Sequence, residues 1–438
     1  MDIFGTLVLI ILLFAVLFAG VPIGFGLGFL AVTGILLFLQ PNHLPQLVNI
    51  AFTQSTSSTV LMIPLFIFMA EIFSCTGIGI DIFEMVSRRL KKIKTNLGMS
   101  SVIASTIFSA LCGSSPATAA TIGTISVPAM LKNGYKPSFA AGIQAAGGTL
   151  GILIPPSISL AIYGIITETS IAKLFIAGLL PGIMLSIMII FFIMVWAKFK
   201  SEVIVLPAQT EIEVSDKNGT VSASKDILTV GPVLCLIVFI LVCLYFGWAT
   251  PTEVGGLGAI GAILIGLIKG RLNPERLMNA CLRTARTSSM IMFIMFGGLS
   301  FVFVITSLGL PQEISKFVAS ISPNKWVTLI SVNILLLVLG CLLDPLGMVV
   351  ITIPFLFPTL MAQGFDPIWL GVIITINVEV AMITPPVGLN LFVLKGVGNV
   401  SMEDVVKGSL PFVIVLLAGM VILMVVPEVA LFLPSTMK

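Results

Sequence analysis

The sequence predicts an all-α polytopic membrane protein that consists of two repeats of opposite topology. Of its 438 residues, 58% are hydrophobic and only 9% are charged, whereas about a quarter of a soluble protein is charged. The apolar runs are about 18 to 25 residues long and do not alternate, which fits membrane helices and excludes barrel strands. The third observation is that helix breakers of the first half recur 230 residues later in the second half.

The repeat is defined by residues that interrupt helices. The matching pairs are Pro128 and Pro358, Gly134 and Gly364, Pro137 and Pro367, Pro155–Pro156 and Pro385–Pro386, Gly178 and Gly408, and Pro181 and Pro411. Helix breakers at corresponding positions of two hydrophobic halves are typical of the binding site of a secondary transporter.

The expected membrane spans follow from the length of the apolar runs. They lie at about 4–20, 22–39, 59–75, 138–168, 173–197, 227–247, 252–269, 287–307, 367–396 and 405–433. The spans 138–168 and 367–396 are discontinuous, because each contains Pro-Pro. The apolar stretches 98–131 and 326–361 have polar, helix-breaking centres, and we interpret them as re-entrant hairpins. The domains are then an N-terminal repeat, 1–197, a cytoplasmic linker, 198–226, and an inverted C-terminal repeat, 227–438.

Basic residues predict the orientation of the chain, because cytoplasmic loops are rich in Lys and Arg. Three clusters fall on one side of the expected spans: Arg88, Arg89, Lys91, Lys92 and Lys94; Lys198 and Lys200; and Lys269, Arg271, Arg276, Arg283 and Arg286. We assign that side to the cytoplasm, and the loops 41–49 and 311–324 to the outside. Five spans separate equivalent points of the repeats, so the two copies face opposite ways.

Three short amphipathic segments are expected to lie along the membrane surface as arm helices. They are 81–94, 274–286 and 311–324, and in each of them apolar residues recur at helical spacing. Two interpretations stay open, a mechanical role in transport and an ordinary connection in the headgroup plane.

The centre of the first hairpin contains the first candidate site. Ser115 is expected to cap a helix that begins at Pro116, so hydroxyls, free carbonyls and a helix N-terminus meet at mid-membrane. Carbonyls and hydroxyls suit a hard cation such as sodium, and a helix N-terminus suits an anion. The alternative is a Ser/Thr packing motif between helices.

The second hairpin has Asp344 followed by Pro345 at the matching place. A carboxylate inside the membrane is costly and indicates a functional site, here an anion for sodium. The plain alternative is a helix cap without a ligand.

The two Pro-Pro interruptions free upstream carbonyls, which need partners in a dry environment. A bound cation is one such partner, and water or a neighbouring helix is another. We therefore expect two sodium sites, one in each half, around a substrate site. The sodium-binding residues are expected to be Gly113, Ser114, Ser115, Thr118, Gly148, Gly151, Pro155, Asp344, Pro345, Glu379, Thr384 and Pro385. The substrate-binding residues are expected to be Ser114, Ser115, Thr149, Ser157, Gly388 and Asn390.

Several other classes of site are excluded by the sequence. There is no P-loop, no Cys-x-x-Cys pair and no catalytic cluster, so we expect neither an enzyme nor an organic cofactor, and no binding of nucleic acid. The G-x-G-x-x-G at 256–261 lies in a membrane span and indicates helix packing. The roles of Glu71 and Glu253 are left open, as caps, internal pairs or relays. The N-terminus lacks a basic n-region, so we expect the first span to be retained.

Three motifs resemble one transporter family. They are GSSPATAATIG at 113–123, GILIPPS at 151–157 and ITPPVGLN at 383–390, and the similarity extends over essentially the whole chain. The chain resembles the large membrane subunit of tripartite ATP-independent periplasmic (TRAP) transporters. The resemblance implies a multi-pass protein of the bacterial inner membrane that imports an organic acid, such as a C4-dicarboxylate, a keto acid or sialic acid, by a sodium-coupled elevator motion.

The resemblance also implies two protein partners, a soluble periplasmic substrate-binding protein and a small membrane subunit of about four helices. Because this chain begins directly with the large subunit, the small one is expected to be a separate chain. Two other functions remain as alternatives, a stand-alone sodium/anion symporter of similar fold and a channel.

Overall fold

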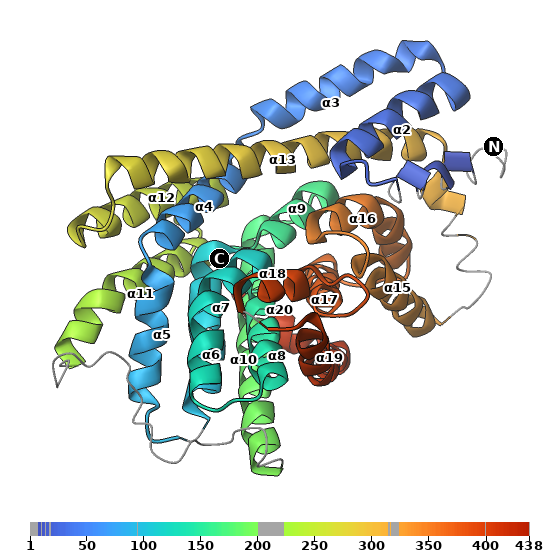
Figure 1. Ribbon diagram of the computed structural model, residues 1–438. Helices are drawn as coiled ribbons and strands as arrows, with labels where there is room; N and C mark the ends of the chain where they lie inside the picture. Colours follow the sequence, from blue (N-terminus) through green and yellow to red (C-terminus); the bar gives the residue numbers. More distant parts are fainter. Residues whose placement is uncertain are drawn as a thin grey trace.

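The structure is a computed structural model that describes the chain except for residues 1–7, 10, 14, 17–18, 94, 200–222, 314–315, 317–323, 399 and 438. Its described part is all-helical, which confirms the predicted all-α class (Figure 1). Seven of the described helices are long and apolar enough to cross a membrane. These seven are α4 (Ser58–Cys75), α10 (Ile171–Phe199), α11 (Ala223–Tyr245), α12 (Pro251–Ile268), α13 (Pro274–Ser307), α16 (Pro345–Ala362) and α19 (Met402–Val425).

The remaining helices are shorter. They are α2 (Ile23–Phe38), α3 (Leu44–Thr56), α5 (Ile78–Arg89), α6 (Asn96–Cys112), α7 (Ser115–Lys132), α8 (Pro137–Thr149), α9 (Ile158–Thr167), α15 (Lys325–Gly340), α17 (Pro367–Met382), α18 (Leu389–Gly398) and α20 (Glu428–Ser435), with 3-10 turns η1 (Pro41–His43) and η2 (Leu150–Ile152).

The helices fall into two groups. In the first, which we call the scaffold group, α2 and α4 pack against the long helix α13, and α12 packs against α4 and α11. In the second, α6 to α10 pack with α15 to α20. We call it the tip group, because it contains the centres, or tips, of the two expected hairpins: the first tip between α6 and α7, and the second between α15 and α16. Figure 1 shows α13 lying across the molecule beside α2, α3, α4 and α12, above the tip group.

The tip group contains the same set of elements twice. Helices α7 and α16 both begin and end 230 residues apart, and so do the starts of α8 and α17. Gly134 and Gly364 have the same positive φ of 79°, and both Pro-Pro peptide bonds are cis. The local structure therefore repeats at the offset found in the sequence, while the opposite orientation of the two copies stays a prediction.

Two expected spans differ from the structure. The separate arm 274–286 and span 287–307 form one continuous helix, α13, because no Pro or Gly lies between them to end the first. The single span 405–433 is divided into α19 and α20. The division falls at Val426–Pro427, where Pro427 has no amide hydrogen to continue the helix.

The expected loops and arms also differ in part from the structure. The expected outer loop 41–49 is helical in η1 and the start of α3, and the arm 81–94 is helical only up to Arg89. About half of the first span, 4–20, and most of the linker 198–226 and of the arm 311–324 lie outside the described residues. The end of that linker already belongs to α11, where Asp226 accepts a hydrogen bond of 2.6 Å from Arg88 of α5.

Candidate functional site

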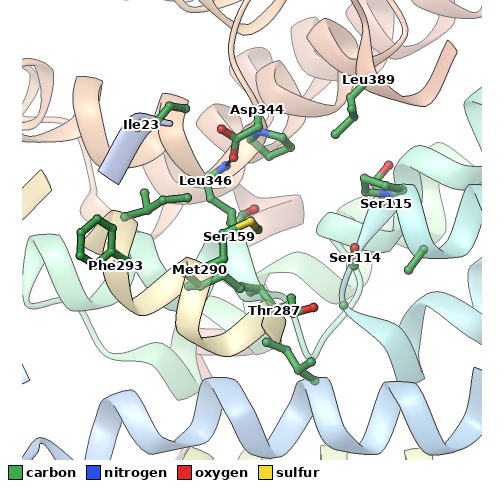
Figure 2. A pocket seen from close by; sticks show the side chains of 18 of the residues that line it. Ile23, Ser114, Ser115, Ser159, Thr287, Met290, Phe293, Asp344, Leu346 and Leu389 are labelled. Carbon is green, nitrogen blue, oxygen red and sulfur yellow. Dashed lines mark hydrogen bonds between the residues drawn. The ribbon is translucent and has the colours of Figure 1, made fainter. Parts of the chain in front are cut away.

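A cavity of about 1000 Å³ lies between the two helix groups. The scaffold group lines it with the start of α2, with Glu71 of α4 and with Thr287 of α13. The tip group lines it with Ser114 and Ser115, between α6 and α7, and with Asp344, between α15 and α16. Figure 2 shows these groups approaching from separate elements, so that the two tips and α13 converge on one space.

The first tip is shaped by Gly113. This residue ends α6 with a φ of +61°, a conformation that favours glycine, and Ser114 is extended before α7 begins. A Cβ on Gly113 would lie 2.2 Å from the carbonyl oxygen of Pro156, so no side chain fits. The tip therefore contacts the interrupted segment between α8 and α9 backbone to backbone.

Oxygen atoms gather where the tip meets this segment. A Cβ built on Gly151 would lie 2.9 Å from both the carbonyl oxygen of Ser114 and Oγ1 of Thr118. The Thr118 hydroxyl is fully buried and, apart from the weakly hydrogen-bonding thiol of Cys112, has no hydrogen-bond partner within the described residues. A buried polar atom without a partner is costly, so the missing partner indicates a ligand or a water molecule. Carbonyl and hydroxyl oxygens at such a place suit a hard cation.

The second tip is shaped by Asp344, which is the N-cap of α16. Its Oδ2 accepts hydrogen bonds from the amides of Leu346 at 3.2 Å and Gly347 at 3.1 Å, and Pro345 occupies the first turn. Its carboxylate nevertheless lines the cavity (Figure 2). Capping and exposure to the cavity are therefore combined in one side chain, which places a negative charge at this tip.

A hydrogen bond joins the two halves of the chain at the first tip. Asn390 of α18 is fully buried, and its Nδ2 donates to Oγ of Ser115 at 2.7 Å. Its Oδ1 has no hydrogen-bond partner in the described part of the chain. The interrupted helix of the C-terminal half thus holds the tip of the N-terminal half.

Comparison with known proteins identifies the family of the chain. The family model described as "Tripartite ATP-independent periplasmic transporter, DctM component" matches residues 10–429. The chain belongs to this family. The C4-dicarboxylate TRAP transporter large permease protein DctM of Pseudomonas aeruginosa is 36% identical over 410 residues, which cover 93% of each chain. The sialic acid TRAP transporter large permease protein SiaM of Vibrio cholerae is 29% identical over 429 residues, which cover 96% of each chain.

A solved structure supports the fold. The YdaH transporter of Alcanivorax borkumensis aligns with a TM-score of 0.65 and 14% identity, covering 91% of this chain and 89% of that one. At this identity the likeness concerns the fold alone. The protein is therefore a TRAP large permease subunit, a multi-pass protein of the bacterial inner membrane and not an enzyme.

Most of the other residues expected to bind sodium or substrate in this TRAP subunit lie away from the cavity wall. Gly148 packs on Ala119 in the contact between α7 and α8. The hydroxyl of Thr149, in α8, donates to the carbonyl oxygen of Ala146, and that of Thr384, just after α17, donates to the carbonyl oxygen of Val380. Residues Ser157, Pro155, Pro385 and Gly388 belong to the two interruptions, where Ser157 caps α9 by accepting from the amide of Leu160.

Glu379 is an expected sodium ligand in the interior of the tip group. It lies in α17 and is fully buried, and apart from a contact with the backbone of Leu153 neither carboxylate oxygen has a hydrogen-bond partner in the described part of the structure. It does not line the cavity. Its position in the tip group, one helical turn before the second interruption, keeps it a candidate for binding a cation inside that group.

One detail of the first tip was predicted wrongly. Ser114, and not Ser115, is the N-cap of α7, and no side-chain hydrogen bond closes that cap. The helix begins one residue earlier because Pro116 is tolerated anywhere in the first turn, where amide hydrogens have no helical partner. The Ser115 hydroxyl, which does not cap the helix, accepts a hydrogen bond from the side-chain amide of Asn390.

The cavity also contains polar residues that were not predicted. Ser74 of α4, Ser159 of α9, and Thr287 and Ser289 of α13 line it. The run Thr287–Ser288–Ser289 is a signal that sequence reasoning had available, because three hydroxyls in succession within an apolar span are unusual. Ser74 and Ser159 stand alone in apolar helices and carry no such signal.

Proposed function

We propose that this subunit imports an organic acid, a C4-dicarboxylate, sialic acid or a related carboxylate, together with sodium ions. The observation that carries the proposal is the buried Thr118 hydroxyl, which lacks a strong hydrogen-bond partner and lies beside the carbonyl of Ser114, a residue that lines the cavity. In this arrangement a sodium ion takes the free oxygens at the tip, while the cavity takes the substrate. The names of the relatives, which include C4-dicarboxylate and sialic acid permeases, support the substrate class.

The proposed transport step is an elevator motion. The cavity lies between the scaffold group and the tip group, so both tips border a single compartment at the junction of the groups. Movement of the tip group along the scaffold group would then carry the substrate and its ions together. Two partners complete the proposal: a soluble periplasmic protein that delivers the acid, and a small membrane subunit of four helices that braces the large one.

Uptake into liposomes tests the proposal. We expect the large and small subunits together, supplied with binding protein, to accumulate radiolabelled succinate or sialic acid against its gradient when an inward sodium gradient is imposed. Collapse of that gradient should stop accumulation. Accumulation without any binding protein would favour a stand-alone sodium/anion symporter, and flux that only equilibrates the substrate would favour a channel.

Replacing Thr118 by Val should weaken sodium binding at the first tip. Valine keeps the shape of threonine and removes only the oxygen, so one ligand of the proposed ion is lost. Because a hydrogen bond or ligand contact to a charged group contributes about 1.5–3 kcal/mol, the half-saturating sodium concentration should rise roughly tenfold or more. The measurement is initial uptake as a function of sodium concentration.

Thr124→Val is the matched control on the same helix. Thr124 is exposed and donates its hydroxyl hydrogen to the carbonyl oxygen of Ala120 at 2.7 Å. The same chemical change there should leave the sodium dependence as in the wild type. A sodium curve of Thr118→Val that coincides with that of Thr124→Val would contradict the sodium site.

A further inference from the structure

The charge on the cavity wall is unexpected for a compartment that carries an organic anion. Among the described residues that line it, the charged side chains are the carboxylates of Glu71 and Asp344, and no Lys, Arg or His takes part. Like charges repel strongly where water is scarce. The wall alone therefore opposes the entry of a carboxylate substrate.

The two carboxylates belong to different helix groups, which the proposed elevator motion displaces relative to each other. Asp344 belongs to the second tip, where two backbone amides already bind its Oδ2 and a cation is proposed to bind. Glu71 belongs to α4 of the scaffold group, which packs against α6, the helix that leads to the first tip. Its charge therefore comes from the scaffold group and lies in the same compartment as the first tip.

The nearest cation only partly compensates Glu71. Nη1 of Arg283 lies 3.9 Å from Oε2 of Glu71, and the arginine side chain is 70% exposed while that of the glutamate is 25% exposed. Long, exposed ion pairs of this kind contribute little. Arg283 lies one helical turn before Thr287 and, unlike Thr287, does not line the cavity. Most of the negative charge of Glu71 is therefore still felt by a ligand in the cavity.

We propose that Glu71 acts as a charge filter, a fixed carboxylate in the scaffold wall that keeps the empty cavity closed to organic anions until sodium ions have bound. The inference rests on the proposed function and deepens it. Once cations neutralise the tips, the net charge around the compartment becomes favourable and the substrate enters. An anion without its sodium ions is repelled, so the gradient is not lost by uncoupled passage of substrate.

The test compares Glu71→Gln and Glu71→Asp with the wild type in the liposome assay, with small subunit and binding protein present and radiolabelled succinate as the probe. Glutamine removes the charge and keeps the shape. We expect Glu71→Gln to raise uptake in sodium-free buffer about three- to tenfold, because one like charge no longer repels succinate, and to raise the half-saturating sodium concentration, because sodium loses one opposite charge in the compartment. Glu71→Asp keeps the charge and should behave as the wild type.

Arg283→Gln provides a second measurement that does not depend on the folding of the glutamate variants. It exposes the full charge of Glu71, so uptake in sodium-free buffer and the half-saturating sodium concentration should both fall, whereas Arg286→Gln, the control on the same helix, should change neither. A merely structural ion pair predicts the same direction of change for Glu71→Gln and Arg283→Gln.

Two outcomes would overturn the inference: coincident sodium curves of wild type and Glu71→Gln, or shifts of the same sign in Glu71→Gln and Arg283→Gln. If the wild type itself showed no sodium-dependent uptake, the proposed function would fail first, and the inference with it. The two failures are therefore distinguished by the wild-type curve.

Discussion

Replacing Gly113 by Ala should reduce sodium-driven uptake by roughly tenfold or more. The substitution meets two obstacles, since Gly113 has a φ of +61° and the new Cβ would lie 2.2 Å from the carbonyl oxygen of Pro156. The left-handed conformation alone costs a residue other than glycine about 1–2 kcal/mol. Because the neighbour is backbone, the tip must move away from the interrupted segment, and the oxygens around Thr118 separate. Initial uptake in liposomes at saturating sodium and at limiting sodium measures the effect.

Gly364→Ala is the control that separates the two obstacles. Gly364 has a φ of +79°, and nothing lies within 4 Å of a Cβ built on it. The variant therefore has the same kind of backbone strain without the collision, and it should keep most of the uptake. Equal losses in both variants would show that the contact with Pro156 is unimportant.

Replacing Gly408 by Ala should give the largest loss of stability. Helices α8 and α19 cross so closely that a Cβ on Gly408 would lie 1.8 Å from the carbonyl oxygen of Ser138, and one on Gly142 would lie 2.1 Å from that of Gly408. Close approach through small residues is how membrane helices gain packing energy. Forcing the helices apart should cost about 3 kcal/mol, the upper part of the usual range for overpacking. A thermal-unfolding assay in detergent measures the shift.

Gly396→Ala is the matched control for this prediction. Gly396 lies in α18 of the same helix group, and nothing lies within 4 Å of its added Cβ. Its melting temperature should equal or exceed that of the wild type, because alanine favours a helix more than glycine does. If Gly408→Ala had the same melting temperature as Gly396→Ala, that result would contradict the close crossing of α8 and α19.

The sequence predicted the parts of the fold that are encoded locally. Helix breakers such as Pro155–Pro156 and Gly134 act on their own backbone, so their recurrence predicted where the elements of the tip group repeat. The same holds for Asp344, which caps α16 through the amides directly after it. These features need no knowledge of distant contacts.

The parts that were missed depend on contacts between distant segments. The bond between Asn390 and Ser115 joins residues 275 positions apart, and no local pattern announces it. The place of Glu71 on the cavity wall depends on how α4 packs against the other helices, so its role was left open from the sequence. The arm and span that form α13 were separated by a change in polarity, which alone does not end a helix.

The Asn390 amide has a consequence for how the two halves respond to ions. The first tip cannot reorganise independently, because its Ser115 hydroxyl is bound by Asn390 of the opposite half. Asn390 lies at the start of α18, directly after the second interruption. Occupancy at one end thus biases the shape of the other in both directions, as thermodynamic reciprocity requires. With independent halves the two proposed ion sites would fill independently, whereas this linkage predicts that they fill cooperatively.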